Sequence, residues 1–197
     1  INTEGEKDTT ILSVYGKTVY MDGKVFEDFG DMTNILGENA PKIPLNLTWV
    51  KIADANSNSW EVSKVPFTNI DVSSMSGGIP ATMNGNNTMT GYKKGTAVVN
   101  IKGTNYTAQE FNIETKLTGT VKSFNIDAAS VVYTNTQRFW FVEGVGMVKF
   151  EIAPTTYEIK YSPLAKQMSS DLEDMKMVSG GNVSTVIDFE NQIFYKN

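Results

Sequence analysis

The sequence predicts a mostly β protein, built on a single antiparallel, strongly curved sheet or half-barrel with one C-terminal helix packed on it. Residues 138–151 place two apolar runs around a Gly-x-Gly, which is the pattern of a β-hairpin. Residues 110–117 alternate polar and apolar side chains, so this strand has one face on the core and one in water. Residues 139–142 are apolar at every position, and we expect both faces of that segment to be covered.

The other strands are predicted from their local patterns. β-Prone runs at residues 11–20 and 24–29 flank Asp22-Gly23, a signal for a two-residue hairpin turn. Residues 45–53 and 60–65 predict an antiparallel pair joined by an Asn/Ser-rich turn. Residues 68–95 are rich in Asn, Gly, Ser and Met, so we expect a long loop there, with at most a short strand. Four strands in meander order follow between residues 96 and 152.

The C-terminal part contains the one stretch of helical composition, residues 163–175. Leu164, Met168, Leu172 and Met175 would form one apolar stripe on such a helix. Residues 183–189 and 193–195 then predict one or two closing strands. A chain of 197 residues is long enough for one core, so we expect a flexible polar leader at residues 1–10 and a single β-rich domain at residues 11–197.

Composition excludes several classes of function. The formal net charge is -5, and Arg138 is the sole arginine among 17 basic residues, so nucleic acid is not an expected partner. The sequence has no cysteine and no histidine, which excludes disulfides, thiol nucleophiles, Cys/His zinc sites and histidine bases. No apolar run approaches the roughly 18 residues of a membrane span, so no bilayer-spanning segment is expected. We predict no cofactor, no metal site and no catalytic residue.

Three patterns suggest chemistry, and each has a plainer structural explanation. Residues 144–149 lack the third glycine and the following helix of a dinucleotide loop, so a tight turn is favoured. Glu110 and Glu114, with Glu143 or Glu151 on a neighbouring strand, offer carboxylate pairs for glycoside chemistry, but a solvated sheet face is favoured. The nine methionines include soft ligands suited to Cu(I), but core packing is favoured.

Aromatic side chains give the one ligand hypothesis. A curved sheet with a helix against it often encloses a lipid or another small apolar ligand. We predict that the residues able to line such a cavity include Trp49, Trp60, Tyr92 and Trp140. The alternative is that the helix fills the concave face.

Residues 140–149, WFVEGVGMVK, resemble the Tyr/Trp-Phe-x-x-Gly-Val-Gly-Leu/Met-Val-Lys signature of TapB-like and related exported bacterial β-proteins. The strand entry at residues 106–111 also fits, and the similarity covers residues 96–152. This resemblance implies a sheet like that of lipoprotein-carrier half-barrels, in secreted or lipid-anchored proteins of Bacteroidetes-type bacteria. It implies an exported location, in the periplasm or as an outer-membrane lipoprotein of a Gram-negative bacterium, and it transfers no catalytic residue.

The function expected from these observations is a non-enzymatic binding or envelope-associated module, with an apolar ligand as one version of it. Two alternatives stay open. One is a carbohydrate-binding or carbohydrate-acting protein that uses exposed aromatics and the Glu110/Glu114 face. The other is a structural subunit of a surface assembly, which would need an exposed edge strand or a large apolar patch.

Overall fold

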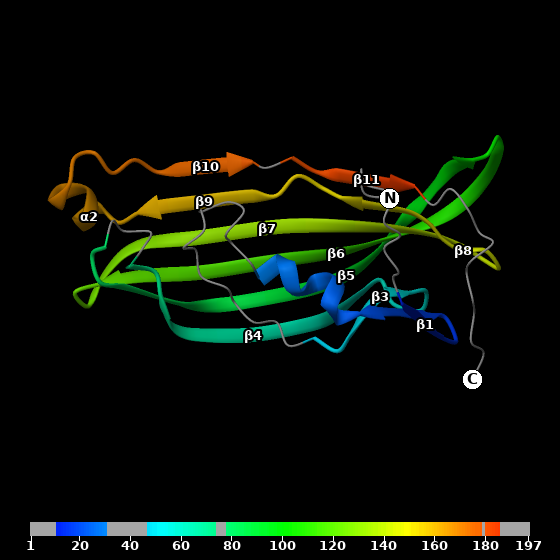
Figure 1. Ribbon diagram of the computed structural model, residues 1–197, viewed down its shortest axis with the longest axis horizontal. Coiled ribbons are helices and arrows are strands. Elements are labelled where there is room, and N and C mark those ends of the chain that lie inside the picture. The colour runs from blue at the N-terminus through cyan, green and yellow to red at the C-terminus, as the bar shows by residue number, and fades with distance from the viewer. Residues whose placement is uncertain (1–10, 31–46, 74–77, 179, 186–197) are drawn as a thin grey trace.

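The computed structural model describes residues 11–30, 47–73, 78–178 and 180–185, and it is mostly β with antiparallel sheets, as the sequence predicts (Figure 1). The described strands fall into two sheets instead of the expected single one. The strands are β1 (Leu12–Tyr15), β2 (Thr18–Asp22), β3 (Trp49–Asp54), β4 (Ser59–Asp71), β5 (Ala81–Ile101), β6 (Thr104–Ser123), β7 (Ile126–Val142), β8 (Gly146–Ile152), β9 (Thr156–Tyr161), β10 (Met175–Val178) and β11 (Asn182–Thr185).

The large sheet is a meander of long strands in the order β4, β5, β6 and β7. The free edge of β7 is shared by two short strands that lie end to end, since β9 pairs with residues 129–134 and β8 with residues 137–142. β10 and β11 extend this arrangement by pairing with β9 and β8. The described strands close no barrel and the large sheet is not strongly curled, so the half-barrel remains a prediction.

The small sheet consists of β1, β2 and β3 and lies against one end of the large sheet (Figure 1). The prediction of a hairpin turn at Asp22-Gly23 is wrong. The chain turns at residues 16–17 instead, where Gly16 has a φ of 59°. Asp22 Oδ1 accepts a hydrogen bond from Lys24 N at 3.0 Å, and the 3₁₀ helix η1 (Gly23–Gly30) starts there. The Asp-Gly pair therefore begins a helix.

The long loop expected at residues 68–95 is also wrong, because β5 is a strand of 21 residues that starts at Ala81. Its inward positions are occupied by small or unbranched residues, and two of them are glycines opposite aromatic rings. A Cβ on Gly91 would lie 2.0 Å from the Trp60 ring, and a Cβ on Gly85 would lie 2.0 Å from the Thr118 carbonyl oxygen and 2.6 Å from the Phe67 ring. The glycines thus make room for aromatic side chains of β4.

The predicted C-terminal helix is much shorter than expected. Helix α2 spans Pro163–Met168 and begins with a Ser162 hydroxyl that accepts a hydrogen bond from Ala165 N. It has no buried residue, so the expected apolar stripe does not pack on the sheet. Ser169 is extended and ends the helix, and Met175 lies in β10. No helix among the described ranges is long and apolar enough to cross a bilayer.

Three apolar clusters form the core. Strand alternation places two of them on the same face of the large sheet, which we call the inner face. The proximal cluster lies under the small sheet and contains Met21, Phe26, Val50, Ile52, Ala53, Trp60, Met89, Phe111, Ile113 and Phe139. The distal cluster contains Phe67, Val72, Ala81, Met83, Leu117, Ala129, Val131, Tyr133, Tyr157 and Ile159.

The third cluster lies on the opposite, outer face, where Val99, Ile101 and Ala108 of the β5–β6 hairpin pack with Trp140 and Val148. Phe139 is buried on the inner face and Trp140 on the outer face. This confirms that the first half of the segment 139–142 is covered on both sides. The β7–β8 hairpin is confirmed as well, with φ values of 74° at Gly144 and 109° at Gly146.

The predicted leader at residues 1–10 and the closing strand at residues 193–195 lie outside the described residues.

Candidate functional site

The four aromatic residues predicted to bind a ligand do not meet at one place. Trp60 is buried in the proximal cluster on the inner face, whereas Trp140 is buried on the outer face. Trp49 begins β3 with about half of its side chain exposed. Tyr92 is half-buried, on the outer face of β5, with Lys94 Nζ 4.7 Å from its ring centroid. Their proposed role in ligand binding stays a prediction.

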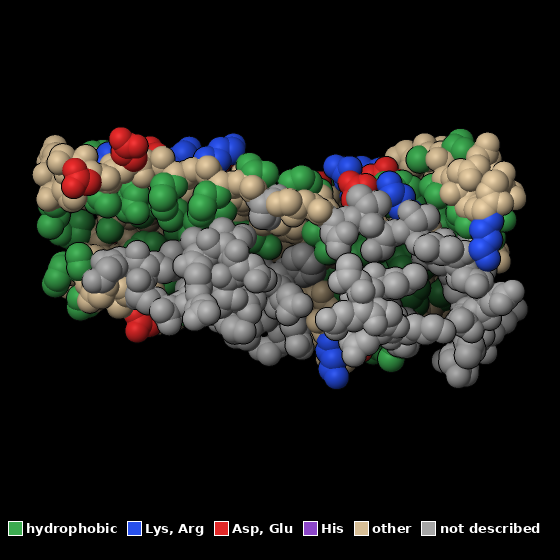
Figure 2. Space-filling model, turned by 45° about the horizontal axis from the view of Figure 1, so that its top comes forward, with side chains coloured by type: hydrophobic (Ala, Val, Ile, Leu, Met, Phe, Trp, Pro, Cys, Tyr) green, Lys and Arg blue, Asp and Glu red, His purple; other side chains and the backbone are tan. Residues whose placement is uncertain are grey.

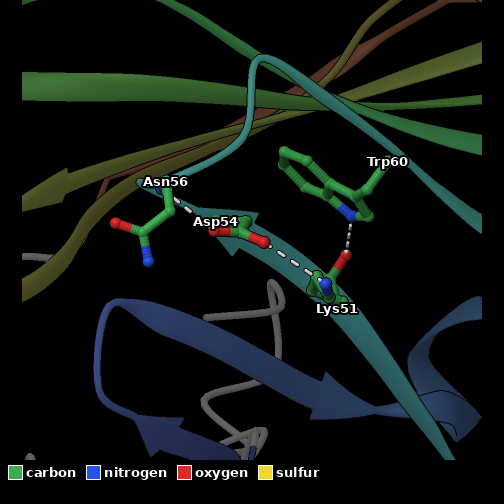
Figure 3. Close-up of polar contacts among 4 residues, drawn as sticks. All are labelled: Lys51, Asp54, Asn56 and Trp60. Carbon is green, nitrogen blue, oxygen red and sulfur yellow. Dashed lines mark hydrogen bonds and ion pairs between the residues drawn. The ribbon is translucent and has the colours of Figure 1, made fainter.

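Trp60 joins the two sheets through a polar network at the β3–β4 turn (Figure 3). Its Nε1 donates to the carbonyl oxygen of Lys51 at 2.9 Å, and its ring lies 6.3 Å from that of Phe111. Asp54 accepts hydrogen bonds from Asn56 N at 3.0 Å and from Lys51 Nζ at 3.3 Å. Burial alone would raise the pKa of Asp54, but these hydrogen bonds outweigh it and hold the pKa below its usual value. This network connects the small sheet to the large sheet, and we call it the proximal joint.

The carboxylates considered for glycoside chemistry lie on the outer face or in a turn. Glu151 is held between Arg138 Nη1 at 3.0 Å and Lys149 Nζ at 3.2 Å. Lys149 Nζ also lies 4.1 Å from the ring centroid of Trp140. Glu114 has Lys94 Nζ at 3.9 Å, and Glu143 is exposed in the β7–β8 turn. Within the described residues no group of three or more acidic side chains is placed to hold a metal ion.

A stripe of uncharged polar side chains crosses the inner face between the proximal and distal clusters. Along β6 the inward residues are Phe111, Ile113, Thr115 and Leu117. Thr115 lies between Ile113 of the proximal cluster and Leu117 of the distal cluster, so its hydroxyl is placed where the two clusters meet. The register places Asn135 opposite Thr115, and Gln137 opposite Ile113. The polar stripe consists of Asn87 on β5, Thr115 on β6, Asn135 and Gln137 on β7, and Tyr157 on β9.

The polar stripe is buried, and most of its polar atoms have no partner. None of its five residues is more than 2% exposed. Among the described residues, no hydrogen-bond partner exists for Asn87 Nδ2 and Oδ1, Thr115 Oγ1, Asn135 Oδ1, Gln137 Nε2 and Oε1, or Tyr157 OH. A buried polar group without a partner costs about 1–3 kcal/mol, and most buried polar groups in proteins are paired. The stripe therefore gathers buried polar atoms without a described partner in one part of the inner face.

The edge of the stripe shows what a satisfied arrangement looks like. Asn135 Nδ2 donates to Thr155 Oγ1 at 2.8 Å, between two buried side chains. Burial raises the pKa of the neighbouring Tyr133 to about 12, partly offset by a hydrogen bond with Thr155, and burial also raises the pKa of Tyr157. Both phenols therefore keep their protons at neutral pH and can donate hydrogen bonds.

Charge is kept away from this stripe. The strand registers place the charged side chains of β4 to β10 on the outer face, as with Lys116, Arg138 and Glu158. Lys93 is the exception within these described strands, and its Nζ donates to the Ala55 carbonyl oxygen at 2.9 Å, at the proximal end. The interior of the large sheet is thus lined by apolar and neutral polar groups.

Exposed apolar side chains gather at the end of the molecule that carries α2 and β10 (Figure 2). Ser123 Oγ donates to the Pro80 carbonyl oxygen, and Ser162 N donates to that of Ala128, so several loops meet there. The exposed residues at this end include Ile79, Phe124, Ile126, Leu164, Met168, Met175 and Met177. A nearby depression of about 220 Å³ between β9 and β10 is lined by Ile159, Met175 and four charged residues, two of which, Glu158 and Lys176, form an ion pair.

Sequence reasoning did not find the polar stripe, although part of its signal is visible. Thr115 occupies an apolar position in the alternation of β6, and Asn135 and Gln137 do the same in β7. Their alignment depends on strand register, which single-strand patterns do not provide.

The segment that carries the family resemblance, residues 140–149, forms the end of β7, the Gly144 turn and the start of β8. Its residues serve the hairpin and the outer cluster, and the relationship to exported β-proteins stays a prediction. Comparisons with protein-family models, with curated proteins and with solved structures find no match to this chain.

Proposed function

We propose that this chain is a non-enzymatic binding module that holds a small apolar ligand against the distal half of the inner face. The observation that carries the proposal is a difference in make-up between the two clusters within the described residues. The small sheet and η1 supply residues to the proximal cluster, whereas every described member of the distal cluster comes from the large sheet or from Val72, just after β4. The proposal includes the exported, envelope-associated setting expected from the sequence.

The chemistry of the distal half suits a hydrocarbon chain. Its inward side chains come from five strands and include Phe67, Met83, Leu117, Val131 and Ile159. Each methylene removed from water contributes about 0.8 kcal/mol, so roughly ten methylenes supply about 8 kcal/mol before the entropy of association is subtracted. A micromolar ligand needs a net of about 8 kcal/mol, so a long acyl chain is the right order of size.

The first test measures whether the interior takes up an apolar probe. N-phenyl-1-naphthylamine should gain fluorescence in a saturable manner when added to folded protein. Protein purified from its own host should release a lipid on solvent extraction, and native mass spectrometry should show the matching mass difference. A folded, monodisperse sample that binds no probe and carries no lipid would contradict the proposal.

The second test places the probe on the inner face. Val131 and Val132 are neighbours on β7, with Val131 buried in the distal cluster and Val132 on the outer face. Val131→Asn should weaken probe binding about tenfold or more, and Val132→Asn should leave it near the wild-type value. Because a buried amide costs about 1–3 kcal/mol, far-UV circular dichroism checks that both variants are folded at the assay temperature. Equal binding by the two variants would move the site away from this face.

A further inference from the structure

We propose that the polar stripe recognises an uncharged hydrogen-bonding group in the ligand, of the ester or hydroxyl type found in a neutral glycerolipid. The inference rests on the proposed function and names the ligand class for the same face. The acyl chain lies on the distal cluster, and the neutral polar group lies against Asn87, Thr115 and Gln137.

The first argument is the number of unpartnered atoms at one place. Asn87 and Gln137 each have both side-chain polar atoms buried without a described partner. Thr115 pairs with Asn135 across the β6–β7 register, and Asn87 stands diagonal to Thr115 across β5–β6. Neighbouring strands lie about 4.8 Å apart, so the stripe from β5 to β9 spans roughly 14 Å. A glycerol ester head group fits within this span, and its several oxygens reach part of the stripe at a time.

The second argument is chemical complementarity. The amides offer both donors and acceptors, and Thr115 and Tyr157 offer hydroxyls that do either. Ester carbonyls accept and glycerol hydroxyls both donate and accept, so one neutral head group satisfies both kinds of atom. Such a partner supplies the hydrogen bonds that the buried amides lack.

The third argument excludes a charged ligand. A fatty-acid carboxylate or a phosphate would need a cation beside it when buried. The described charged side chains of β4 to β10 lie on the outer face, and the one inward cation, Lys93, binds the Ala55 carbonyl at the proximal end. A neutral lipid therefore binds this interior better than the corresponding fatty acid.

The experiment compares monooleoylglycerol with oleate, which have the same acyl chain, in displacing N-phenyl-1-naphthylamine at pH 8. Monooleoylglycerol should displace the probe at a concentration at least tenfold lower than oleate. Equal displacement, or preference for oleate, would overturn the ligand class while leaving the proposed function intact. Failure of the probe itself to bind would overturn both.

Variants test the stripe itself. Gln137→Leu and Thr115→Val remove unpartnered polar atoms with little change in shape, so they should raise the melting temperature of the ligand-free protein. Both should weaken monooleoylglycerol binding about tenfold while the probe affinity stays unchanged. Asn86→Leu, next to Asn87 but on the outer face, is the control and should change neither binding constant. A fall in melting temperature, or unchanged monooleoylglycerol binding, in both stripe variants would overturn the proposal.

Discussion

The two halves of the inner face treat buried polar groups in opposite ways. At the proximal end, Trp60 Nε1 and Lys93 Nζ each donate to a backbone carbonyl, and Asp54 accepts two hydrogen bonds. At the stripe that borders the distal half, Asn87 and Gln137 have no described partner. Under the function proposed above, the two ends divide the work: the proximal end stabilises the fold, and the stripe keeps hydrogen-bonding capacity for a ligand. Four changes test this division.

The largest loss of stability is expected from crowding the proximal joint. A Cβ on Gly91 would lie 2.0 Å from Cε2 of Trp60, so Gly91→Val should displace the ring and break its bond to Lys51. We expect a loss of about 3–5 kcal/mol in the free energy of unfolding, as for removal of a large aromatic side chain. Gly95→Val is the control, because nothing lies within 4 Å of its added Cβ. Chemical denaturation measures both, and similar losses would mean that the joint is not special.

The next effect concerns alkaline stability near the stripe. The pKa of Tyr133 is raised to about 12 in the folded state. Its contribution to the free energy of unfolding is therefore complete below the unfolded pKa of 10.0 and is lost as pH rises from 10 to 12. Two pKa units correspond to about 2–3 kcal/mol. Tyr133→Phe should reduce this alkaline loss in melts between pH 8 and pH 12. Tyr15→Phe, at a side chain that is 81% exposed, should keep the wild-type slope.

A smaller effect is expected from the acid side of the proximal network. The pKa of Asp54 is lowered in the folded state. Its contribution to the free energy of unfolding is therefore complete above the unfolded pKa near 3.8 and is lost as pH falls through the folded pKa. Asp54→Asn should cost about 1 kcal/mol at pH 7, since it weakens charge-assisted hydrogen bonds. The gap between the two melting curves should close below pH 4. Asp127→Asn, at an exposed ion pair, should show a much smaller gap at pH 7.

The smallest change should be a gain, at the distal end. Phe124 and Asn125 form the two-residue β6–β7 turn with φ values of 49° and 63°, a conformation that favours Asn and Gly. Phe124→Asn should stabilise the protein by about 0.5–1 kcal/mol. Phe124→Leu keeps the backbone cost and should give no gain. If the Leu variant were as stable as the Asn variant, exposure of the phenyl ring and not its backbone would be the cause.

The sequence predicts the elements whose local chemistry and tertiary role agree. The Gly144 and Gly146 turn and the alternation from Phe111 to Leu117 both appear as expected, because turn geometry and the period of two act locally. β5 is missed because Asn and Gly are rare in strands, and their composition masks the alternation of Met83 and Met89. Here side-chain packing overrides β-propensity, since Gly85 and Gly91 leave space for the aromatic rings of β4.

The candidate site could be predicted only in part, because it depends on contacts between strands. Burial of Trp140 follows from the apolar run at residues 139–142 in which it lies, but the separation of Trp60 and Trp140 onto opposite faces depends on register. The helical stripe at residues 163–175 fails because Ser169 is extended and Met175 pairs with Ile159 as a strand. The spacing of apolar residues along the sequence cannot distinguish a helix from a strand when the edge of a sheet is available to pair with the segment.

The end-to-end arrangement of β8 and β9 along β7 also affects how the molecule opens. The ladder on that side of β7 is interrupted at residues 153–155, where Ala153 N still donates to the Thr136 carbonyl at 2.8 Å. The two short strands can therefore detach separately, as independent cooperative units. Amide hydrogen exchange should report two distinct opening free energies for β8 and β9. Because the interruption lies next to the stripe, detachment of one of these strands opens the interior in part while the rest of the sheet stays folded.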